Sequence, residues 1–265
     1  MKTILITGST DGIGKLAAIK LAKDGHHIIL HGRNSEKLEK TITEIREQTH
    51  NTQVTGFVAD LSDFQSIRTI AADISQKIQK IDVLLNNAGV FKSNIQGNKD
   101  GLDLRFTVNY FAPVLLTNSL MPLLEKSTAP RLINLSSAAQ STVNIPTLKG
   151  TEIESEQATY AQSKLALTMW SFYLSKQQSD INVIAVNPGS LLNTRMVQEA
   201  YGQFWSSADK GADILYDLAL SDEYIHSSGK YFDNDKGYFS NAHKDAYDQE
   251  RIARLISETN SILSL

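Results

Sequence analysis

Two side chains in the middle of the chain could together carry a proton transfer. Tyr160 and Lys164 are four residues apart, so on a helix they share one face. A free tyrosine has a pKa near 10, and proton exchange near neutrality requires a pKa roughly two to three units lower, which is worth about 3 to 4 kcal/mol. A lysine ammonium beside the phenol supplies a positive charge that favours this shift. Tyr160 is the only one of the nine tyrosines with a lysine at this spacing, although such a pair can equally form a solvated helix face.

A second candidate for chemistry is the glycine-rich run TGSTDGIGK at residues 7–15. A P-loop would need a glycine where Ser9 stands and a hydroxyl where Leu16 stands, so triphosphate chemistry does not fit. The dinucleotide fingerprint fits better, because its glycines let the backbone turn, approach a pyrophosphate and pack a helix on a strand. The glycines in question are Gly8, Gly12 and Gly14, at a wider spacing than the commonest fingerprint. Read alone, the run leaves open a glycine turn with no ligand.

The residue after the second apolar run bears on which dinucleotide the site accepts. A carboxylate about twenty residues beyond the glycines binds the ribose hydroxyls of NAD, whereas an arginine accommodates the extra phosphate of NADP. Arg33 stands here, and its guanidinium is always charged and can pair with a phosphate bidentately. The sequence therefore favours NADP and leaves NAD possible. Asp11 complicates this interpretation because it lies in the glycine loop near the expected phosphate, and Arg33 by itself can also be a solvated surface residue.

The elements that must position these residues follow a regular order. Short apolar runs occur at residues 3–7, 27–30, 53–58, 83–85, 132–135 and 183–186, with stretches of helical periodicity between them. This β-α rhythm predicts an α/β fold with a doubly wound parallel sheet, a Rossmann fold, in which ligands bind at the carboxyl ends of the strands. The last third predicts a helix near residues 207–220, a strand at 229–232 and an amphipathic helix around 246–262. We expect a single domain over residues 1–265.

Composition excludes several classes of function. The formal net charge is −3 and no block of lysine and arginine occurs, so neither nucleic acid nor an acidic membrane surface is an expected partner. The chain has no cysteine, and its six histidines are scattered without ligand spacing, so no metal is expected. It begins almost at once with an apolar run and contains no stretch of membrane-spanning length, which predicts a cytoplasmic protein without a membrane anchor.

Further polar motifs fall after the later strands, and together with those above they form an ordered set. Each motif alone can be a helix cap or a strand-ending turn. The set comprises TGSTDGIG at residues 7–14, Asp60-Leu61, NNAG at 86–89, Asn109 in TVNYFAP, Ser137 in LINLSS, YAQSK at 160–164 and NPG at 187–189. With these residues the chain resembles the short-chain dehydrogenase/reductase family over nearly its whole length.

The resemblance implies hydride transfer between a nicotinamide cofactor and an alcohol or carbonyl compound. In carbonyl reduction Ser137 would hydrogen-bond the carbonyl oxygen and Tyr160 would give it a proton. Lys164 would bind the nicotinamide ribose and lower the pKa of the tyrosine, and Asn109, bulging its helix, would hold a water. The implied catalytic group is therefore Asn109, Ser137, Tyr160 and Lys164. The implied cofactor contacts are Gly8, Ser9, Thr10, Gly12, Ile13, Gly14, Arg33, Asp60, Leu61, Asn87, Ala88, Gly89, Tyr160, Lys164, Pro188 and Gly189.

Within the family, the chain looks most like the retinol-dehydrogenase-like branch. The features are the GRN turn, the long gap between Ser137 and Tyr160, the YAQSKLAL helix and the late SGKYF segment at residues 228–232. Many members of that branch carry a membrane-anchoring amino terminus that this sequence lacks, so a retinoid substrate is not carried over. The family often has a threonine where Asn193 stands, and here Thr194 follows one position later. Family members usually form dimers or tetramers, so a homodimer or homotetramer is expected.

Two loops should border the substrate, because residues 138–159 and 190–207 follow the fifth and sixth strands. The second loop contains Met196, Tyr201, Phe204 and Trp205, which can form an apolar lid or a helix that packs on the core, and Phe91 would add to the same wall. We expect an NADP-dependent alcohol dehydrogenase or carbonyl reductase acting on a small apolar molecule. A catalytically silent NADP(H)-binding sensor would not need serine, tyrosine and lysine together, and a nucleotide-sugar epimerase would want a longer carboxyl-terminal region.

Overall fold

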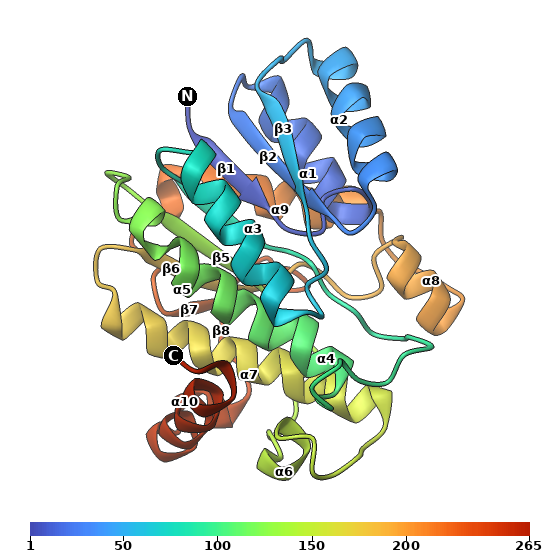
Figure 1. Cartoon of the computed structure of the whole chain (residues 1–265), viewed down its shortest axis with the longest axis vertical. Helices are drawn as coiled ribbons and strands as arrows, with labels where there is room; N and C mark the ends of the chain where they lie inside the picture. Colours follow the sequence, from blue (N-terminus) through green and yellow to red (C-terminus); the bar gives the residue numbers. More distant parts are fainter.

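The fold is built on one eight-stranded sheet, seen in a computed structural model that describes all 265 residues (Figure 1). The strand order is β3-β2-β1-β4-β5-β6-β7-β8, in which β1 to β7 run parallel and β8 is an antiparallel edge. The strands are β1 Thr3–Ile6, β2 His27–Gly32, β3 Val54–Val58, β4 Val83–Asn86, β5 Arg131–Leu135, β6 Asn182–Asn187, β7 Lys230–Asp233 and β8 Tyr238–Ser240. The predicted doubly wound α/β fold is confirmed.

Helices cover both faces of the sheet. They are α1 Gly12–Lys23, α2 Ser35–Thr49, α3 Phe64–Lys77, α4 Leu104–Phe106, α5 Ala112–Leu124, α6 Ile145–Leu148, α7 Glu156–Gln177, α8 Arg195–Tyr201, α9 Ala208–Leu220 and α10 Gln249–Leu263. A π-helix, η1 Thr107–Phe111, joins α4 to α5, and two short 3-10 helices are η2 Asp222–Tyr224 and η3 Lys244–Tyr247. None of the helices combines the length and the apolar character that a bilayer crossing requires.

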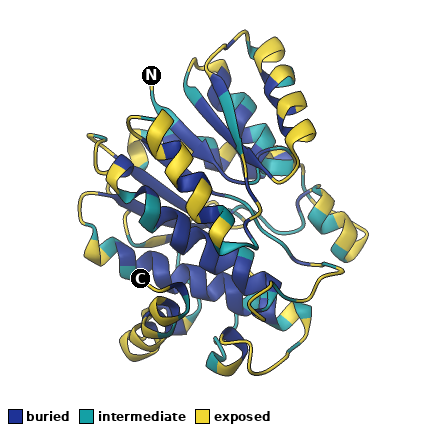
Figure 2. Ribbon diagram, viewed as in Figure 1, coloured by how far each residue is buried: buried dark blue, intermediate teal, exposed yellow.

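Alternate residues of the central strands supply two separate cores, because successive side chains of a strand point to opposite faces. Ile4 and Ile6 of β1 pack with α1, α2 and α9, whereas Leu5 between them packs with α3, α5, α7 and α10. The central strands are buried on both faces, as Figure 2 shows. This burial explains why the strands read as unbroken apolar runs in the sequence.

Strand β8 was not expected from the sequence, whereas a helix was one of two interpretations of the loop that contains α8. Strand β8 is only three residues long, which gives too few residues for a period-two pattern. Helix α8 buries none of its residues, so of the two interpretations of the 190–207 loop a helix packed on the core is wrong. Figure 1 shows α8 standing away from the sheet, beside the loop that follows β4.

Candidate active site

The carboxyl ends of β1, β4 and β5 bring the predicted motifs to one edge of the sheet. The Asn87 side chain, just after β4, donates hydrogen bonds through Nδ2 to the carbonyl oxygens of Thr7 (2.7 Å) and Gly8 (3.0 Å). The Thr7 hydroxyl oxygen accepts in return from the backbone N–H groups of Asn87 and Ala88, both at 3.0 Å. Asn87 and Ala88 therefore hold the glycine loop in place, and their predicted contact with a cofactor stays a prediction.

Two of the three glycines allow this close approach. Gly8 has a φ of +63°, and a Cβ there would lie 2.8 Å from the Cα of Ala88. A Cβ on Gly14 would lie 2.4 Å from Asn87 Nδ2 and 2.7 Å from the Gly8 carbonyl oxygen. Larger residues would push the loop away from the segment after β4, so the predicted role of these glycines in close packing has a physical basis.

The loop ends at the amino terminus of α1, which suits a phosphate. Asp11 caps the helix, its side chain accepting from the Gly12 N–H at 2.9 Å. The remaining N–H groups of the first turn have no partners within the helix and carry the positive end of its dipole. A Cβ on Gly12 would meet only the Thr194 side chain, at 3.7 Å, so the backbone has open space there. This donor set fits a pyrophosphate.

The Asp11 carboxylate, which lies near the expected ribose phosphate, is neutralised by a neighbouring lysine. Asp11 forms an ion pair with Lys37 Nζ at 2.6 Å, and the hydrogen bond from Lys37 holds the pKa of Asp11 below its usual value. Lys37 lies in the first turn of α2, directly beyond Arg33, which is exposed after β2. The acidic charge in the glycine loop is thus paired, and the Arg33 guanidinium, which forms no ion pair within the chain, remains available for a ribose phosphate.

A buried histidine, His31, supports the glycine loop and was missed by the sequence analysis. The Gly8 N–H donates to His31 Nδ1 at 3.1 Å, so the ring proton lies on Nε2, which donates to the Ala59 carbonyl oxygen at 3.1 Å. The Ser9 N–H also donates to the His31 carbonyl oxygen at 3.0 Å. Burial lowers the pKa of His31 to about 4. The only sequence feature that includes His31 is the HGRN turn, where the arginine is the residue that indicates cofactor binding.

The depressed pKa of His31 predicts a stability that falls with acid. The unfolded chain binds a proton near pH 6.5, whereas the folded chain stays neutral down to about pH 4, so the contribution is complete above pH 6.5 and is lost as pH falls toward 4. Between pH 7 and pH 5 the loss is about 2 kcal/mol. Urea unfolding at both pH values should show this difference for the natural chain and a smaller one for His31→Gln. Equal pH dependence in both proteins would contradict the assignment.

The predicted catalytic residues come together below this loop. Ser155 caps α7 by accepting from the Ala158 N–H, which starts the helix so that Tyr160 and Lys164 lie on one face. Lys164 is buried, and its Nζ donates to the Leu135 carbonyl oxygen at 2.7 Å and lies 5.7 Å from the centre of the Tyr160 ring. Ser137 follows β5 beside the phenol, and its carbonyl oxygen accepts from the Tyr231 hydroxyl at 3.0 Å.

The sequence predicts a lowered pKa for Tyr160, and the protein groups around it do the opposite. Burial raises the pKa of Tyr160 to about 12, and the Ser137 hydroxyl opposes this only in part. The Lys164 ammonium does not lower it, because it points to the Leu135 carbonyl oxygen; burial lowers the pKa of Lys164 itself to about 8. At neutral pH the phenol is therefore protonated, which is the form that can give a proton.

Asn109 lies in the π-helix η1, in keeping with the bulge that the resemblance implies. Its side chain is buried, and its Oδ1 accepts from the Val90 N–H at 2.8 Å. Its Nδ2 donates to the Val90 carbonyl oxygen and to Ser163 Oγ, both at 3.0 Å. Asn109 thus ties the segment after NNAG to the catalytic helix α7, and the water it was expected to hold stays a prediction.

The remaining predicted cofactor residues lie in turns around the same edge. Asp60 Oδ1 accepts from the Ser62 N–H at 2.9 Å, which makes a local turn before α3, and Leu61 is buried behind it. After β6, the Gly189 N–H donates to Asn187 Oδ1 at 3.2 Å. These contacts are internal to the chain, so the cofactor contacts of Asp60, Leu61, Pro188 and Gly189 stay predictions. The structure contains no cluster of three or more metal-binding side chains.

Aromatic rings wall the space in front of Tyr160. Phe91 packs edge-on against the Tyr160 ring with 4.8 Å between ring centres, and Tyr201 lies 5.7 Å from Phe91. Three aromatic residues on or after α8 are exposed to at least half their area: Tyr201 (50%), Phe204 (50%) and Trp205 (74%). The backbone enters this segment through Leu191, whose φ of +47° lies in the left-handed region that non-glycine residues rarely adopt.

Comparison with known proteins agrees with this geometry. Residues 2–203 match the family model for short chain dehydrogenases. The chain is 34% identical to human retinol dehydrogenase 13, over 100% of this chain and 85% of that protein, and 31% identical to human polyprenol dehydrogenase, over 89% and 77%. Among solved structures, a short-chain dehydrogenase from Shigella flexneri complexed with NADP has a TM-score of 0.70 and 29% identity, covering 88% of this chain and 97% of that one.

A second solved structure, an uncharacterized protein from Mycobacterium paratuberculosis, covers 100% of this chain and 94% of its own with a TM-score of 0.82. Its identity is 24%, so it supports the fold alone. The family model spans most of the chain, and human retinol dehydrogenase 13 covers all of it at more than 30% identity. The relatives named retinol dehydrogenases agree with the branch that the sequence indicated. The chain belongs to the short-chain dehydrogenase family.

Proposed function

We propose that this oxidoreductase uses NADP(H) and transfers hydride between this cofactor and apolar aldehydes or ketones. The observation that carries the proposal is the placement of the Tyr160 phenol beside Ser137, with the buried Lys164 Nζ 5.7 Å from the centre of its ring. A protonated phenol in this position is the form needed to protonate a carbonyl oxygen as it gains charge. Oxidation of an alcohol uses the same contacts in reverse, with the phenolate as the proton acceptor.

Each element of the site has a part in binding the cofactor. The amino terminus of α1 would hold the pyrophosphate, and Arg33, with Lys37 beside it, the ribose phosphate. Lys164 would hold the nicotinamide ribose. When bound, NADPH supplies the hydride that carbonyl reduction needs. Two similar short-chain dehydrogenases, from Shigella flexneri and Escherichia coli, have solved structures in complex with NADP and NADPH.

The chain's own residues then supply positioning and a proton. Ser137 donates a hydrogen bond to the carbonyl oxygen of the substrate, and Tyr160 transfers its proton to that oxygen as the alcohol forms. Lys164, whose Nζ is held by the Leu135 carbonyl oxygen 5.7 Å from the centre of the Tyr160 ring, keeps its place beside the phenol while the proton is transferred. Phe91 and Tyr201 present apolar surface and keep water from the reacting atoms.

The aromatic wall supports an apolar substrate, because aromatic rings present apolar surface to a ligand. The two human relatives reported above are named for retinol and polyprenol, both long and apolar alcohols.

An assay of NADPH consumption against aldehydes, ketones and quinones of graded length tests the proposal. Turnover that rises with chain length is the expected result. No turnover of any compound in either direction would contradict it and favour a catalytically silent sensor. The homodimer or homotetramer and the cytoplasmic location stay predictions.

Replacement of Arg33 by Ala should weaken binding of NADPH much more than binding of NADH. The guanidinium can pair with the phosphate that only NADPH carries, and such charge-assisted pairs are worth about 1.5 to 3 kcal/mol, or roughly tenfold to 150-fold in Kd. Titration by cofactor fluorescence measures both affinities. Glu44→Ala on α2 is the control: it removes the half-buried carboxylate that pairs with Lys15 of α1, and it should leave the ratio unchanged. Equal preference for both cofactors before the substitution would rule out the role of Arg33.

A further inference from the structure

A fully buried arginine lies next to the site and is not used by the proposed reaction. Arg105 sits in α4 with 0% of its surface exposed. Its Nε and Nη2 donate to the two carboxylate oxygens of Asp103, at 2.9 and 2.6 Å. Its Nη2 also reaches the carbonyl oxygen of Gln96 at 3.1 Å, and its Nη1 donates to Glu156 Oε1 at 2.9 Å. One guanidinium thus joins α4, the loop after β4 and the first turn of α7.

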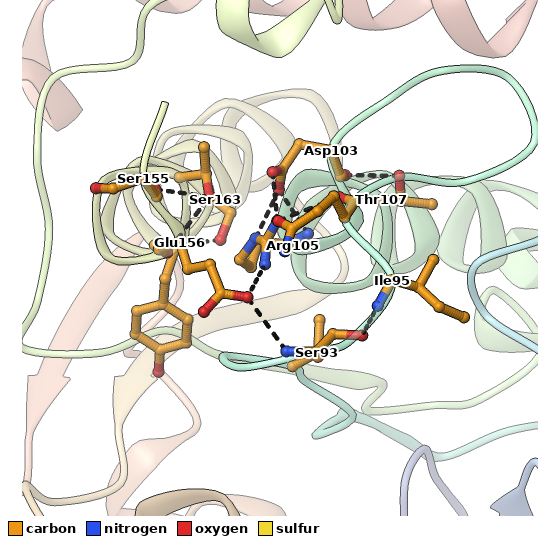
Figure 3. Close-up of polar contacts among 12 residues, drawn as sticks. Ser93, Ile95, Asp103, Arg105, Thr107, Ser155, Glu156 and Ser163 are labelled. Carbon is orange, nitrogen blue, oxygen red and sulfur yellow. Dashed lines mark hydrogen bonds and ion pairs between the residues drawn. The ribbon is translucent and has the colours of Figure 1, made fainter. Parts of the chain in front are cut away.

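Glu156 extends this contact to a second point of the loop. Its Oε1 also accepts from the Ser93 backbone N–H at 3.3 Å, and Figure 3 shows the carboxylate between Arg105 and Ser93. Ser93 in turn orders the loop locally, because its Oγ accepts from the Ile95 N–H at 3.0 Å. The loop is therefore fixed at Ser93 and again at Gln96, although residues 91–96 form no helix or strand.

The same loop carries the wall of the proposed pocket. Phe91 lies two residues before Ser93 and packs edge-on against the Tyr160 ring. Glu156 and Tyr160 are one helical turn apart, so they lie on one face of α7 and contact the same loop. The distance from Phe91 to the proton donor is thus set by two adjacent contacts between the loop and the helix.

We propose that Arg105 and Glu156 form a clamp that positions the loop 91–96 and makes Glu156 a determinant of substrate selectivity. A buried guanidinium is costly unless its hydrogen bonds are satisfied, and such pairs serve to fix one arrangement more than to add stability. The clamp holds Phe91 as a rigid wall. Discrimination between bulky and small carbonyl compounds then depends on this wall, because the neighbouring helix α8 is exposed and has no buried residues to fix it. The selectivity part rests on the proposed carbonyl reduction, and the loop-fixing part does not.

Glu156→Ala tests the clamp without touching the reacting groups. Amide hydrogen exchange in residues 91–96 should become at least about tenfold faster, while exchange in β4 and β5 stays unchanged. The kcat/KM for a long apolar aldehyde, divided by the kcat/KM for a short one, should fall at least about fivefold. The change should come from KM more than from kcat. NADPH affinity should stay within about twofold. Glu156→Gln, which keeps an oxygen for Ser93 and Arg105, should restore most of the exchange protection.

Gln157→Ala is the matched control, because this exposed neighbour occupies the same first turn of α7. It should leave both exchange and selectivity unchanged. Unchanged exchange in residues 91–96 of Glu156→Ala would overturn the clamp, and so would faster exchange spread over the whole sheet, which indicates a general structural role. Faster loop exchange with an unchanged selectivity ratio would overturn the selectivity role. If the natural chain reduces no carbonyl compound, the proposed function fails, and the exchange result still decides whether the clamp exists.

Discussion

Tyr160→Phe is expected to lower the rate of carbonyl reduction by roughly 10² to 10⁴-fold, the range in which a positioned general acid contributes. The substitution removes only the hydroxyl, so the ring can keep its edge-on contact with Phe91 at 4.8 Å. Lys164, whose Nζ is held by the Leu135 carbonyl oxygen, does not depend on that hydroxyl for its position. NADPH affinity should therefore stay within about twofold of the natural value. Steady-state kinetics and a fluorescence titration measure the two quantities separately.

Tyr173→Phe is the matched control, because Tyr173 lies on the same helix α7 beyond Lys164. Its loss of a hydroxyl should leave turnover unchanged. If Tyr160→Phe retains turnover, the proton comes from another group. If it loses NADPH binding together with turnover, Tyr160 shapes the cofactor site and its role as the acid is not supported.

Gly8→Ala is expected to reduce NADPH affinity at least about 100-fold. The new Cβ would lie 2.8 Å from the Cα of Ala88, a backbone atom that cannot move without displacing the segment after β4. The loop would have to shift away from Asn87, whose Nδ2 holds the Gly8 carbonyl oxygen at 3.0 Å, and from His31, which accepts from the Gly8 N–H. Such a shift moves the amino terminus of α1, where we expect the pyrophosphate to bind.

Gly25→Ala is the matched control. It has the same left-handed backbone strain as Gly8→Ala but lacks the steric clash with Ala88. Gly25 has a φ of +75°, similar to the +63° of Gly8, but nothing lies within 4 Å of a Cβ placed there. Both substitutions carry the backbone cost of about 1 to 2 kcal/mol in stability. Only Gly8→Ala should lose NADPH affinity, as measured by fluorescence titration. Similar affinities for the two variants would show that the packing of Gly8 on Ala88 does not shape the cofactor site.

The sequence predicts the fold well because each buried strand is an apolar run that ends at a polar motif. The six runs correspond to β1 to β6, and the segment at 229–232 corresponds to β7. The glycine loop, Ser137, Tyr160 and Lys164 could be identified for the same reason, since they follow strand ends or share a helix turn. The sequence could not decide whether residues 190–207 form a lid or a helix packed on the core, because α8 is short and exposed, and exposed helices have no apolar stripe.

Other features depend on partners that are distant along the chain. His31 resembles a strand residue in the sequence, and its importance comes from Gly8 and Ala59, 23 and 28 positions away. Arg105 gains its role from Glu156, 51 positions away, and no local pattern indicates that pairing. The pKa of Tyr160 was mispredicted because helical spacing tells which residues share a face, but not that Lys164 would point to the Leu135 carbonyl oxygen.

The central claim is that a carbonyl group bound beside Tyr160 receives hydride from NADPH at this site. The most direct test supplies NADPH with deuterium at the transferable position of its nicotinamide, together with a long apolar aldehyde, and determines the mass of the alcohol formed. We predict one deuterium on the former carbonyl carbon with the natural chain and almost no labelled alcohol with Tyr160→Phe. Alcohol that forms without the label, or the same amount of labelled alcohol from both proteins, would contradict the account.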